Sequence, residues 1–253
     1  MTSLKNLTAI VTGAGSGFGE GIARHFAALG AAVIVADLRP EGAERVAADI
    51  NATGGSAAAF TVDVTRDDQV AALAAFAVER FGRIDILINN AGTTHKNRPM
   101  LEVDEATFDR VYAVNVKSIY LTARHIVPVF RKQGGGAIVN VASTAGVRPR
   151  PGLTWYNGSK GAVITLTKSM AAELAPDHIR VNAINPVMGE TGLLTEFLPG
   201  EDSAAVRAKI IATIPLGRLS LPHDMAKACA FLVSDDAAFI TGVCMEVDGG
   251  RCI

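Results

Sequence analysis

Tyr156 and Lys160 are the two side chains in this sequence whose types and spacing best suit proton transfer. They lie four positions apart in a segment of helical periodicity, so both side chains project from one helix face. A free tyrosine titrates at about pH 10, and a nearby lysine charge favours the phenolate and lowers that pKa. The pair therefore predicts proton transfer to or from an alcohol oxygen. The alternative interpretation is a helix-surface pair without a chemical role.

A glycine-rich octet at residues 12–19 reads Thr-Gly-Ala-Gly-Ser-Gly-Phe-Gly and separates a strand-like run from a helix-like segment. Glycines at such a turn let the backbone approach a pyrophosphate, and the following helix N-terminus offers free N–H groups to the anion. Asp37 ends the next strand-like run, 18 positions after Gly19, near the spacing of a ribose-binding acid. These features predict a dinucleotide site. The alternative is a plain turn in which Asp37 caps a helix.

Asp37 also bears on which dinucleotide is bound. A carboxylate accepts hydrogen bonds from both ribose hydroxyls and repels a 2′-phosphate, so Asp37 favours NAD over NADP. Arg39 leaves NADP open as the less favoured cofactor, because an arginine can hold the phosphate.

Short β-branched runs alternate along the chain with longer segments of helical periodicity. The predicted strands are 8–12, 32–37, 57–63, 84–89, 137–141, 180–185 and 243–247. The predicted helices are 17–29, 40–53, 66–81, 104–131 (in one or two pieces), 155–174, 203–213 and 222–234. Such alternation predicts an α/β fold of βαβ units, with a parallel sheet covered by helices on both faces.

No linker divides the 253 residues, so we predict a single domain over 1–253. The irregular stretch at 186–220 holds glycines and prolines around one short helix, and we predict that it is a substrate lid.

Composition excludes several classes of protein. An apolar fraction of 49% with a net charge of −1 excludes a disordered chain and argues against nucleic-acid binding. The odd number of cysteines, three, predicts reduced thiols and a cytoplasmic setting. No apolar stretch reaches the roughly 18 residues of a membrane helix, so no membrane partner is expected. The five scattered histidines lack metal-ligand spacing, so no metal is expected.

Several motifs occur in a fixed order: the octet at 12–19, Asp37, Asn89-Asn90-Ala91-Gly92, Asn115, Ser143, Tyr156, Lys160 and Val247-Asp248-Gly249-Gly250. In this order and spacing the chain resembles the short-chain dehydrogenase/reductase family, in its single-domain form of about 250 residues. The likeness covers essentially the whole chain. It implies a Rossmann-type, doubly wound, seven-stranded parallel sheet, an NAD(P) cofactor, and oxidoreductase activity on CH–OH donors.

The resemblance implies a Ser-Tyr-Lys-Asn active site. Tyr156 would be the general acid/base, and Lys160 would lower its pKa and hold the nicotinamide ribose. Ser143 would hydrogen-bond the substrate oxygen, and Asn115 would anchor a water at a helix kink.

The implied cofactor contacts run from the glycine-rich octet to the segment after the sixth strand. They are Gly13, Ser16, Gly17, Phe18, Gly19, Asp37, Leu38, Asp63, Val64, Asn89, Ala91, Gly92, Tyr156, Lys160, Pro186, Met188 and Thr191. Within this set, Asp63 and Val64 would contact the adenine. Val187 replaces a glycine usual in the family, yet Thr191 and the backbone near Met188 can still reach the nicotinamide carboxamide.

Four further residues are candidates for substrate binding: His95, Arg148, Arg150 and Trp155. The two arginines follow Ser143 closely, so they suggest a carboxylate or phosphate on the substrate. The alternatives are solvent-facing arginines and a solvated loop at His95.

We therefore predict an NAD-dependent oxidoreductase that acts on a small secondary alcohol or ketone of the polyol, sugar or hydroxy-acid type. One alternative is a 3-oxoacyl-carrier-protein reductase, although Asp37 and the acidic Asp177 argue against it. A second is a non-catalytic cofactor sensor, which would not need the four active-site residues. The resemblance also implies a homotetramer, with a dimer as the alternative.

Overall fold

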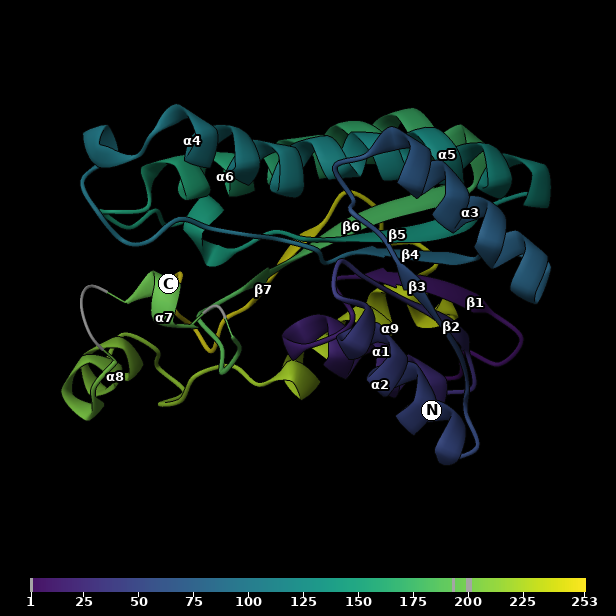
Figure 1. Cartoon of the computed structure of the whole chain (residues 1–253), viewed down its shortest axis with the longest axis horizontal. Helices are drawn as coiled ribbons and strands as arrows, with labels where there is room; N and C mark the ends of the chain where they lie inside the picture. Colours follow the sequence, from purple (N-terminus) through teal and green to yellow (C-terminus); the bar gives the residue numbers. More distant parts are fainter. Residues whose placement is uncertain (1, 193, 199–201) are drawn as a thin grey trace.

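The computed structural model describes residues 2–192, 194–198 and 202–253. Its sheet has seven strands in the order β3-β2-β1-β4-β5-β6-β7, and every neighbouring pair is parallel (Figure 1). The strands are β1 Thr8–Thr12, β2 Ala32–Asp37, β3 Ser56–Thr61, β4 Ile86–Asn89, β5 Gly136–Val141, β6 Ile179–Pro186 and β7 Cys244–Val247. The predicted doubly wound α/β fold is confirmed.

Helices cover both faces of the sheet (Figure 1). On one face lie α1 Gly17–Ala28, α2 Pro40–Ala52 and α9 Pro222–Val233. On the other lie α3 Asp67–Phe81, α4 Glu105–Tyr112, α5 Ser118–Gln133 and α6 Thr154–Leu174. The shorter α7 Leu194–Phe197 and α8 Ala204–Ile211 stand beyond the carboxyl edge of the sheet.

The central strands are apolar throughout because both of their faces are buried. β1 and β4 are fully buried at every position. Alternate residues serve opposite cores: Val11 belongs to the cluster under α1, α2 and α9, whereas Ile10 belongs to the cluster under α3 and α5. The sheet is thereby fixed between two apolar layers, and the loops at its carboxyl edge are held in place.

The segment predicted as one helix or two at 104–131 contains a change of helix type. α4 and α5 are joined by a π-helix, Ala113–Lys117, which contains Asn115. A π-turn widens the helix and redirects its side chains, and such turns are frequent at functional sites. Asn115 therefore lies in a π-turn at the place where the family resemblance implies a helix kink.

The irregular segment 186–220 is anchored by its own small apolar cluster. Val187, Met188 and Leu194 pack there with Ile214 and Leu219. A bridge between Gly189 and Ser220 ties the two ends of the segment together. The segment therefore stands beside the carboxyl ends of the strands as a packed unit.

Candidate active site

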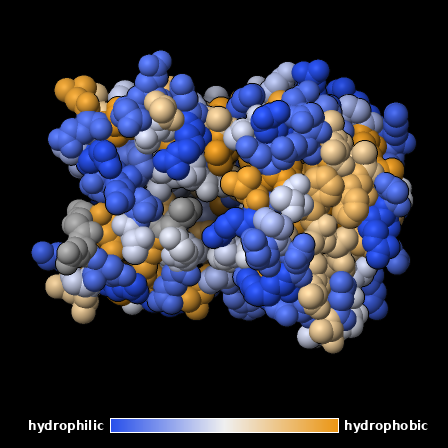
Figure 2. Space-filling model, viewed as in Figure 1, coloured by the Kyte–Doolittle hydropathy of each residue, from blue (hydrophilic) through white to orange (hydrophobic). Residues whose placement is uncertain are grey.

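A cavity of about 570 Å³ opens at the carboxyl edge of the sheet, where β1 and β4 are neighbours. Chain connections leave in opposite directions at this point, which is where open α/β sheets bind ligands. The surface is visibly hollowed there, between the α4–α6 side and the α7–α8 side (Figure 2). The cavity walls come from the glycine-rich turn, the ends of β2, β4 and β5, the start of α6 and the 186–220 segment.

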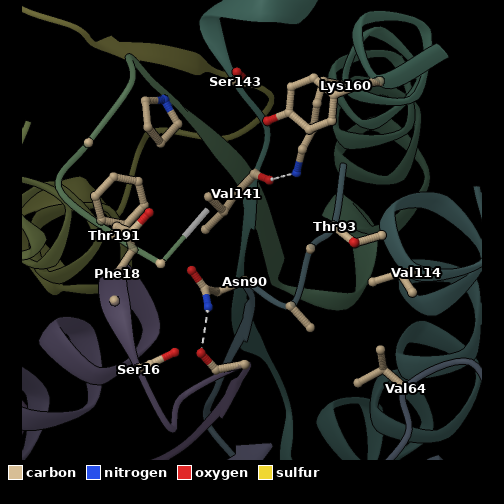
Figure 3. A pocket seen from close by; sticks show the side chains of 18 of the residues that line it. Ser16, Phe18, Val64, Asn90, Thr93, Val114, Val141, Ser143, Lys160 and Thr191 are labelled. Carbon is tan, nitrogen blue, oxygen red and sulfur yellow. Dashed lines mark hydrogen bonds between the residues drawn. The ribbon is translucent and has the colours of Figure 1, made fainter. Parts of the chain in front are cut away.

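The glycine-rich turn forms one end of the cavity. Gly13 and Gly17 line it with φ of +62° and +58°, values that L side chains rarely adopt. Gly19 does not line the cavity, but a Cβ there would collide with the carbonyl oxygen of Gly13. Asn90 steadies the turn, since its Nδ2 donates to the carbonyl oxygens of Thr12 at 2.8 Å and Gly13 at 3.0 Å (Figure 3).

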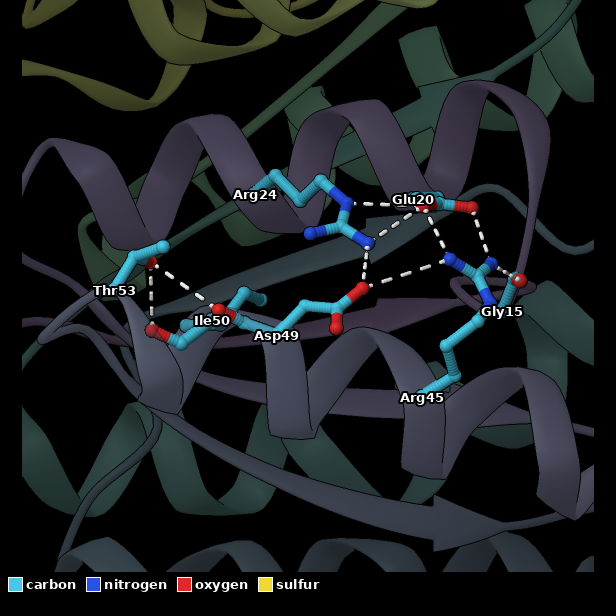
Figure 4. Close-up of polar contacts among 7 residues, drawn as sticks. All are labelled: Gly15, Glu20, Arg24, Arg45, Asp49, Ile50 and Thr53. Atoms are coloured by element: carbon cyan, nitrogen blue, oxygen red, sulfur yellow. Dashed lines mark hydrogen bonds and ion pairs between the residues drawn. The ribbon is translucent and has the colours of Figure 1, made fainter.

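An ion network behind the turn fixes it to the helices (Figure 4). Arg45 of α2 donates to the carbonyl oxygen of Gly15 at 3.0 Å and to Glu20 of α1 at 2.7 Å. Arg24 also contacts Glu20, and both arginines approach Asp49. The Arg45 guanidinium lowers the pKa of Glu20, so this carboxylate stays charged and the network holds the turn against α2.

Asp37 lies at the end of β2 with a buried carboxylate that borders the cavity. It accepts hydrogen bonds from the backbone N–H of Gly15 at 2.8 Å and of Arg39 at 3.0 Å. The Arg39 guanidinium also lines the cavity and donates to the Ser16 hydroxyl at 3.3 Å. A carboxylate accepts about four hydrogen bonds, so Asp37 retains capacity for hydroxyls of a ligand.

Leu38, Asp63 and Val64 border the same end of the cavity, together with Val62. Strand β3 ends at Thr61, two residues before the predicted end, so Asp63 belongs to the following loop. Its Oδ1 accepts from the backbone N–H and hydroxyl of Thr65, at 2.9 and 2.7 Å. This end therefore combines apolar walls with oriented carboxylates, as a nucleoside requires.

The structure separates Asn89, one of the predicted cofactor contacts, from the cavity. Asn89 does not line the cavity: its Nδ2 donates to Asn140 at 2.9 Å and its Oδ1 accepts from Thr122 at 2.9 Å. Asn90 lines it instead, with Ala91 and Gly92. The reason is strand alternation, because successive side chains point to opposite faces and Asn89 points under α5.

Ser143, Tyr156 and Lys160 converge at the other end of the cavity. Lys160 projects from α6 and its Nζ donates to the carbonyl oxygen of Val141 at 2.8 Å (Figure 3). Nζ lies 5.9 Å from the centroid of the Tyr156 ring. Ser143 stands at the end of β5, and its Oγ accepts from the N–H of Ala145 at 3.1 Å. All three side chains are buried.

Burial opposes charge on both members of the Tyr-Lys pair. It raises the pKa of Tyr156, while the Ser143 hydroxyl and the Arg150 charge lower it. Burial lowers the pKa of Lys160 to about 8. The cation acting on the Tyr156 pKa in this structure is thus Arg150, a residue for which the sequence predicted only a substrate contact.

Asn115 lies outside the cavity wall, behind Thr93. Its side chain accepts from the N–H of Thr93 at 2.8 Å and donates to the Thr93 carbonyl at 2.9 Å and to Ser159 Oγ at 3.0 Å. Ser159 in turn donates to the Tyr156 carbonyl at 2.7 Å. Asn115 therefore couples the loop after β4 to the helix that carries the Tyr-Lys pair.

The four predicted substrate residues separate in the structure, and only Arg150 lines this cavity. Arg148 is exposed and donates instead to the main-chain oxygen of Arg251 at 2.7 Å. Trp155 donates from Nε1 to the Met100 carbonyl at 3.1 Å. His95 is buried rather than solvated, and it lines a neighbouring smaller cavity. The sequence could not separate these residues because a loop conformation decides where each side chain points.

The cavity is also bordered by Pro186, the last residue of β6, and by Val187, Met188 and Thr191 after it. Gly189 lies so close to the Phe18 ring that a Cβ would overlap it. The sequence missed the aromatic Phe197, which lies in the cavity wall beside Tyr156 with ring centroids 5.2 Å apart. The position of Phe197 in the cavity wall depends on the fold of the 186–220 segment, and no local sequence pattern predicts it.

These residues suit a dinucleotide by their own geometry. The glycine turn leaves backbone N–H groups open beside Gly17, Asp37 stands at one end and Lys160 at the other, all on one cavity. Within the described ranges, no three His, Cys, Asp or Glu side chains gather closely enough to hold a metal ion. Among the helices of those residues, none is long and apolar enough to cross a membrane.

Comparison with known proteins agrees with this arrangement. Residues 13–251 match a family model described as enoyl-(acyl carrier protein) reductase. The chain belongs to the short-chain dehydrogenase/reductase family, and it is an oxidoreductase acting on CH–OH donors.

Among its relatives, 4-formylbenzenesulfonate dehydrogenase of Comamonas testosteroni is 53% identical over 99% of this chain and 100% of its own length. Cis-4-hydroxycyclohexanecarboxylate dehydrogenase of Sinomonas cyclohexanicum is 40% identical over 96% and 95%. A solved structure of 3-ketoacyl-(acyl-carrier-protein) reductase from Brucella melitensis, complexed with NADH, has a TM-score of 0.93 at 48% identity and covers 99% of this chain and 100% of that one.

Proposed function

We propose that this protein is an NAD-dependent oxidoreductase of a small secondary alcohol or ketone, with Ser143, Tyr156, Lys160 and Asn115 as its active-site residues. The observation that carries the proposal is one cavity that holds Asp37 at one end and the three buried side chains Ser143, Tyr156 and Lys160 at the other. Asp37 would hold a ribose of the cofactor, and Tyr156 and Lys160 would stand at the end of the cavity that takes the reactive ring.

The residues of the chain handle the proton and the oxygen of the substrate. NAD, when bound, supplies the exchange of a hydride with the carbinol or carbonyl carbon. Ser143 donates to the substrate oxygen and stabilises its developing charge. Tyr156 transfers the proton to or from that oxygen, and the Arg150 charge favours its phenolate. We assign the Lys160 ammonium a supporting role of the same sign. Asn115 positions helix α6 through Ser159, which donates to the Tyr156 carbonyl.

NAD is favoured over NADP because the buried Asp37 carboxylate faces the position of the ribose hydroxyls. The neighbour solved with NADH supports the same choice. Arg39 stands at this end as well, but its guanidinium already contacts Ser16.

Among the three substrate types left open by the sequence, a hydroxy acid is the best supported. Two relatives are named for small ring compounds that carry a sulfonate or a carboxylate apart from the reacting group. A carrier-bound 3-oxoacyl substrate is the second candidate, because the Brucella neighbour is named for it. Against it, the Arg131 charge, which could otherwise attract an acidic carrier protein, is paired with the Asp177 carboxylate at 2.8 Å.

The 186–220 segment contributes Met188, Thr191 and Phe197 to the cavity, and we assign it the role of a substrate lid. The three cysteines form no disulfide, which suits a reducing cytoplasm. A homotetramer is the assembly expected from the family, and light scattering tests it; a monomer would contradict this part of the proposal.

The direct test follows NADH absorbance at 340 nm with a panel of small ketones, ketoacids and acetoacetyl-coenzyme A, and repeats it with NADPH. We expect kcat/KM for a small ketoacid to exceed that for acetoacetyl-coenzyme A, and NADH to exceed NADPH by roughly tenfold or more. If the enzyme reduced only acetoacetyl-coenzyme A, the protein would be a 3-oxoacyl-carrier-protein reductase instead. The absence of any turnover would favour a non-catalytic cofactor sensor.

A further inference from the structure

Arg150 occupies the end of the cavity where the substrate must lie. Its guanidinium carbon is 6.0 Å from the centroid of the Phe197 ring, which itself lies 5.2 Å from the Tyr156 ring. The backbone of Arg150 is fixed to the first turn of α6, since its carbonyl accepts from Asn157 Nδ2 at 2.8 Å. Arg150, Phe197 and Tyr156 thus form three sides of one compartment of the cavity.

No described acidic side chain balances the Arg150 charge. Eleven ion pairs join described residues, and Arg150 takes part in none of them. Burial lowers the pKa of Arg150 and the positive charge of Arg251 lowers it further, whereas the Tyr156 phenolate would raise it. Arg251 likewise makes no ion pair among these residues. The positive charges of Arg150 and Arg251 therefore lie close enough to repel each other beside the compartment.

A partly desolvated guanidinium without a partner is unfavourable, and an oxyanion that reaches it removes that cost. The planar fork of arginine matches a carboxylate or a sulfonate through two parallel hydrogen bonds. The exposed Arg148 shows the contrast, because its guanidinium is already satisfied by the main-chain oxygen of Arg251 at 2.7 Å. Arg150 is the arginine of this loop that remains available to a ligand.

Apolar side chains form part of the remaining cavity wall. Val187 and Met188 are buried in the wall, and the Phe197 ring lies between Arg150 and Tyr156. A ligand that fits these walls has a small apolar body, with its reacting oxygen at Tyr156 and its anionic group at the far side. A long flexible or strongly polar substrate would leave Phe197 without a packing partner.

The geometry points to Arg150 as the specificity-determining residue, which binds a carboxylate or sulfonate at the end of the substrate remote from the reacting carbon while Phe197 packs on the substrate body. This inference rests on the proposed function, and it deepens it by naming the substrate class as small, compact hydroxy or oxo acids.

The test compares two ketones that differ in charge and in one methyl group, 4-acetylbenzoate and its methyl ester, with 4-acetylbenzenesulfonate as the sulfonate arm. For the unmodified enzyme with saturating NADH, we expect kcat/KM for the acid to exceed that for the ester by roughly 10- to 100-fold, the range of a hydrogen-bonded charge pair. Arg150→Gln should abolish this preference by raising KM for the acid, so that the acid-to-ester ratio of kcat/KM falls to about one.

Two further variants separate recognition from simple structural damage. Arg150→Lys keeps the charge but loses the fork, so its acid preference should fall between those of the unmodified enzyme and Arg150→Gln. Arg148→Gln removes a neighbouring exposed arginine, and it should preserve the acid-to-ester ratio within about twofold. Equal use of acid and ester by the unmodified enzyme, or an acid preference that survives Arg150→Gln, would overturn the inference.

A binding measurement distinguishes this inference from the proposed reaction. Calorimetry on the Tyr156→Phe enzyme with NADH present measures binding of 4-acetylbenzoate without turnover. If 4-acetylbenzoate binds in a manner that depends on Arg150 but the unmodified enzyme does not turn it over, the anion site is supported and the proposed reaction is refuted. Turnover of neutral ketones alone, with no binding of the acid, would support the reaction and refute the anion site.

Discussion

The Nζ of Lys160 donates a hydrogen bond to the carbonyl oxygen of Val141 at 2.8 Å, which links the catalytic helix α6 to the end of strand β5. The amine is almost completely enclosed, and burial lowers its pKa from the usual 10.5 to about 8. At neutral pH the folded protein therefore holds a poorly solvated ammonium group. Its position beneath the Tyr156 ring explains why that unfavourable arrangement is retained.

Replacing this amine should stabilise the protein while it removes activity. A pKa lowered from 10.5 to about 8 corresponds to about 3 kcal/mol of unfavourable burial at neutral pH. Lys160→Met also leaves the Val141 carbonyl without its donor, which costs about 1–2 kcal/mol. We expect a net gain of about 1–2 kcal/mol at pH 7 in the cofactor-free protein, measured by urea unfolding.

The pH dependence of that gain has a definite sign. The folded-state pKa of Lys160 lies below its unfolded value, so the unfolded chain binds more protons between pH 8 and 10.5. The penalty is complete below that window and disappears as the pH rises through it. The stability difference between Lys160→Met and the unmodified protein should therefore shrink from pH 8 towards pH 10. A difference that grows over this range would contradict the buried-charge explanation.

Tyr156→Phe should isolate the proton-transfer step. In the proposed mechanism the hydroxyl exchanges a proton with the substrate, and general acid–base catalysis contributes roughly 10²- to 10⁴-fold. We expect kcat to fall by at least that factor, while the Kd for NADH, measured by its fluorescence, changes by less than about threefold because the remaining cofactor contacts stay. Retained turnover would refute the assignment of Tyr156.

Arg150 should also influence the pH profile of oxidation. Its positive charge lowers the pKa of Tyr156, as the Ser143 hydroxyl does, whereas burial raises it. Removing the charge in Arg150→Gln therefore raises the pKa of Tyr156, and the rise of kcat/KM with pH should move to higher pH. A neutral alcohol such as 1-phenylethanol is the appropriate substrate, because it makes no ion pair with Arg150.

Arg148→Gln serves as the matched control for that profile, since Arg148 is exposed and contacts the main chain of Arg251 instead of the cavity. Its profile should coincide with that of the unmodified enzyme. A shift of Arg150→Gln to lower pH would show that another group controls the observed ionisation.

The sequence predicts the fold well because its signals are local and repeated. The strand-helix alternation specifies the α/β layers, and the glycine turn with Asp37 locates one end of the cavity. The sequence does not show whether Asn89 or Asn90 faces the cavity, because a shift of one residue along the strand reverses the side to which a side chain points. Arg148 and Arg150 differ in the same way through the conformation of one loop.

Phe197 shows a different limit of the sequence. It comes from α7, a four-residue helix in the 186–220 segment, and reaches Tyr156 only because Val187, Met188 and Leu194 pack beneath that segment. These contacts join positions far apart in the chain. A periodic sequence pattern depends only on residues near one another along the chain. The residues that line the compartment are therefore visible only in the tertiary structure.

Asp37 should control the choice between the two cofactors. Its carboxylate repels a 2′-phosphate, whereas Arg39 nearby would attract one. Asp37→Ser should raise the ratio of kcat/KM with NADPH to that with NADH by roughly tenfold or more. The double variant with Arg39→Gln should lose most of this gain. An unchanged ratio in Asp37→Ser would remove Asp37 from the ribose site.

Gly19 should be indispensable to the glycine turn although it does not touch the cavity. A Cβ at this position would collide with the carbonyl oxygen of Gly13 and with the Asn90 amide that holds the turn. Gly19→Ala should therefore cost about 1–3 kcal/mol of stability by overpacking and weaken NADH binding, because the turn must shift.

Gly161→Ala is the matched control: it lies within α6, and the nearest atom to its new Cβ is 4.0 Å away. There the better helix propensity of alanine should stabilise the protein by up to about 1 kcal/mol. Equal effects of the two substitutions on urea unfolding and NADH affinity would show that the close approach at Gly19 does not shape the site.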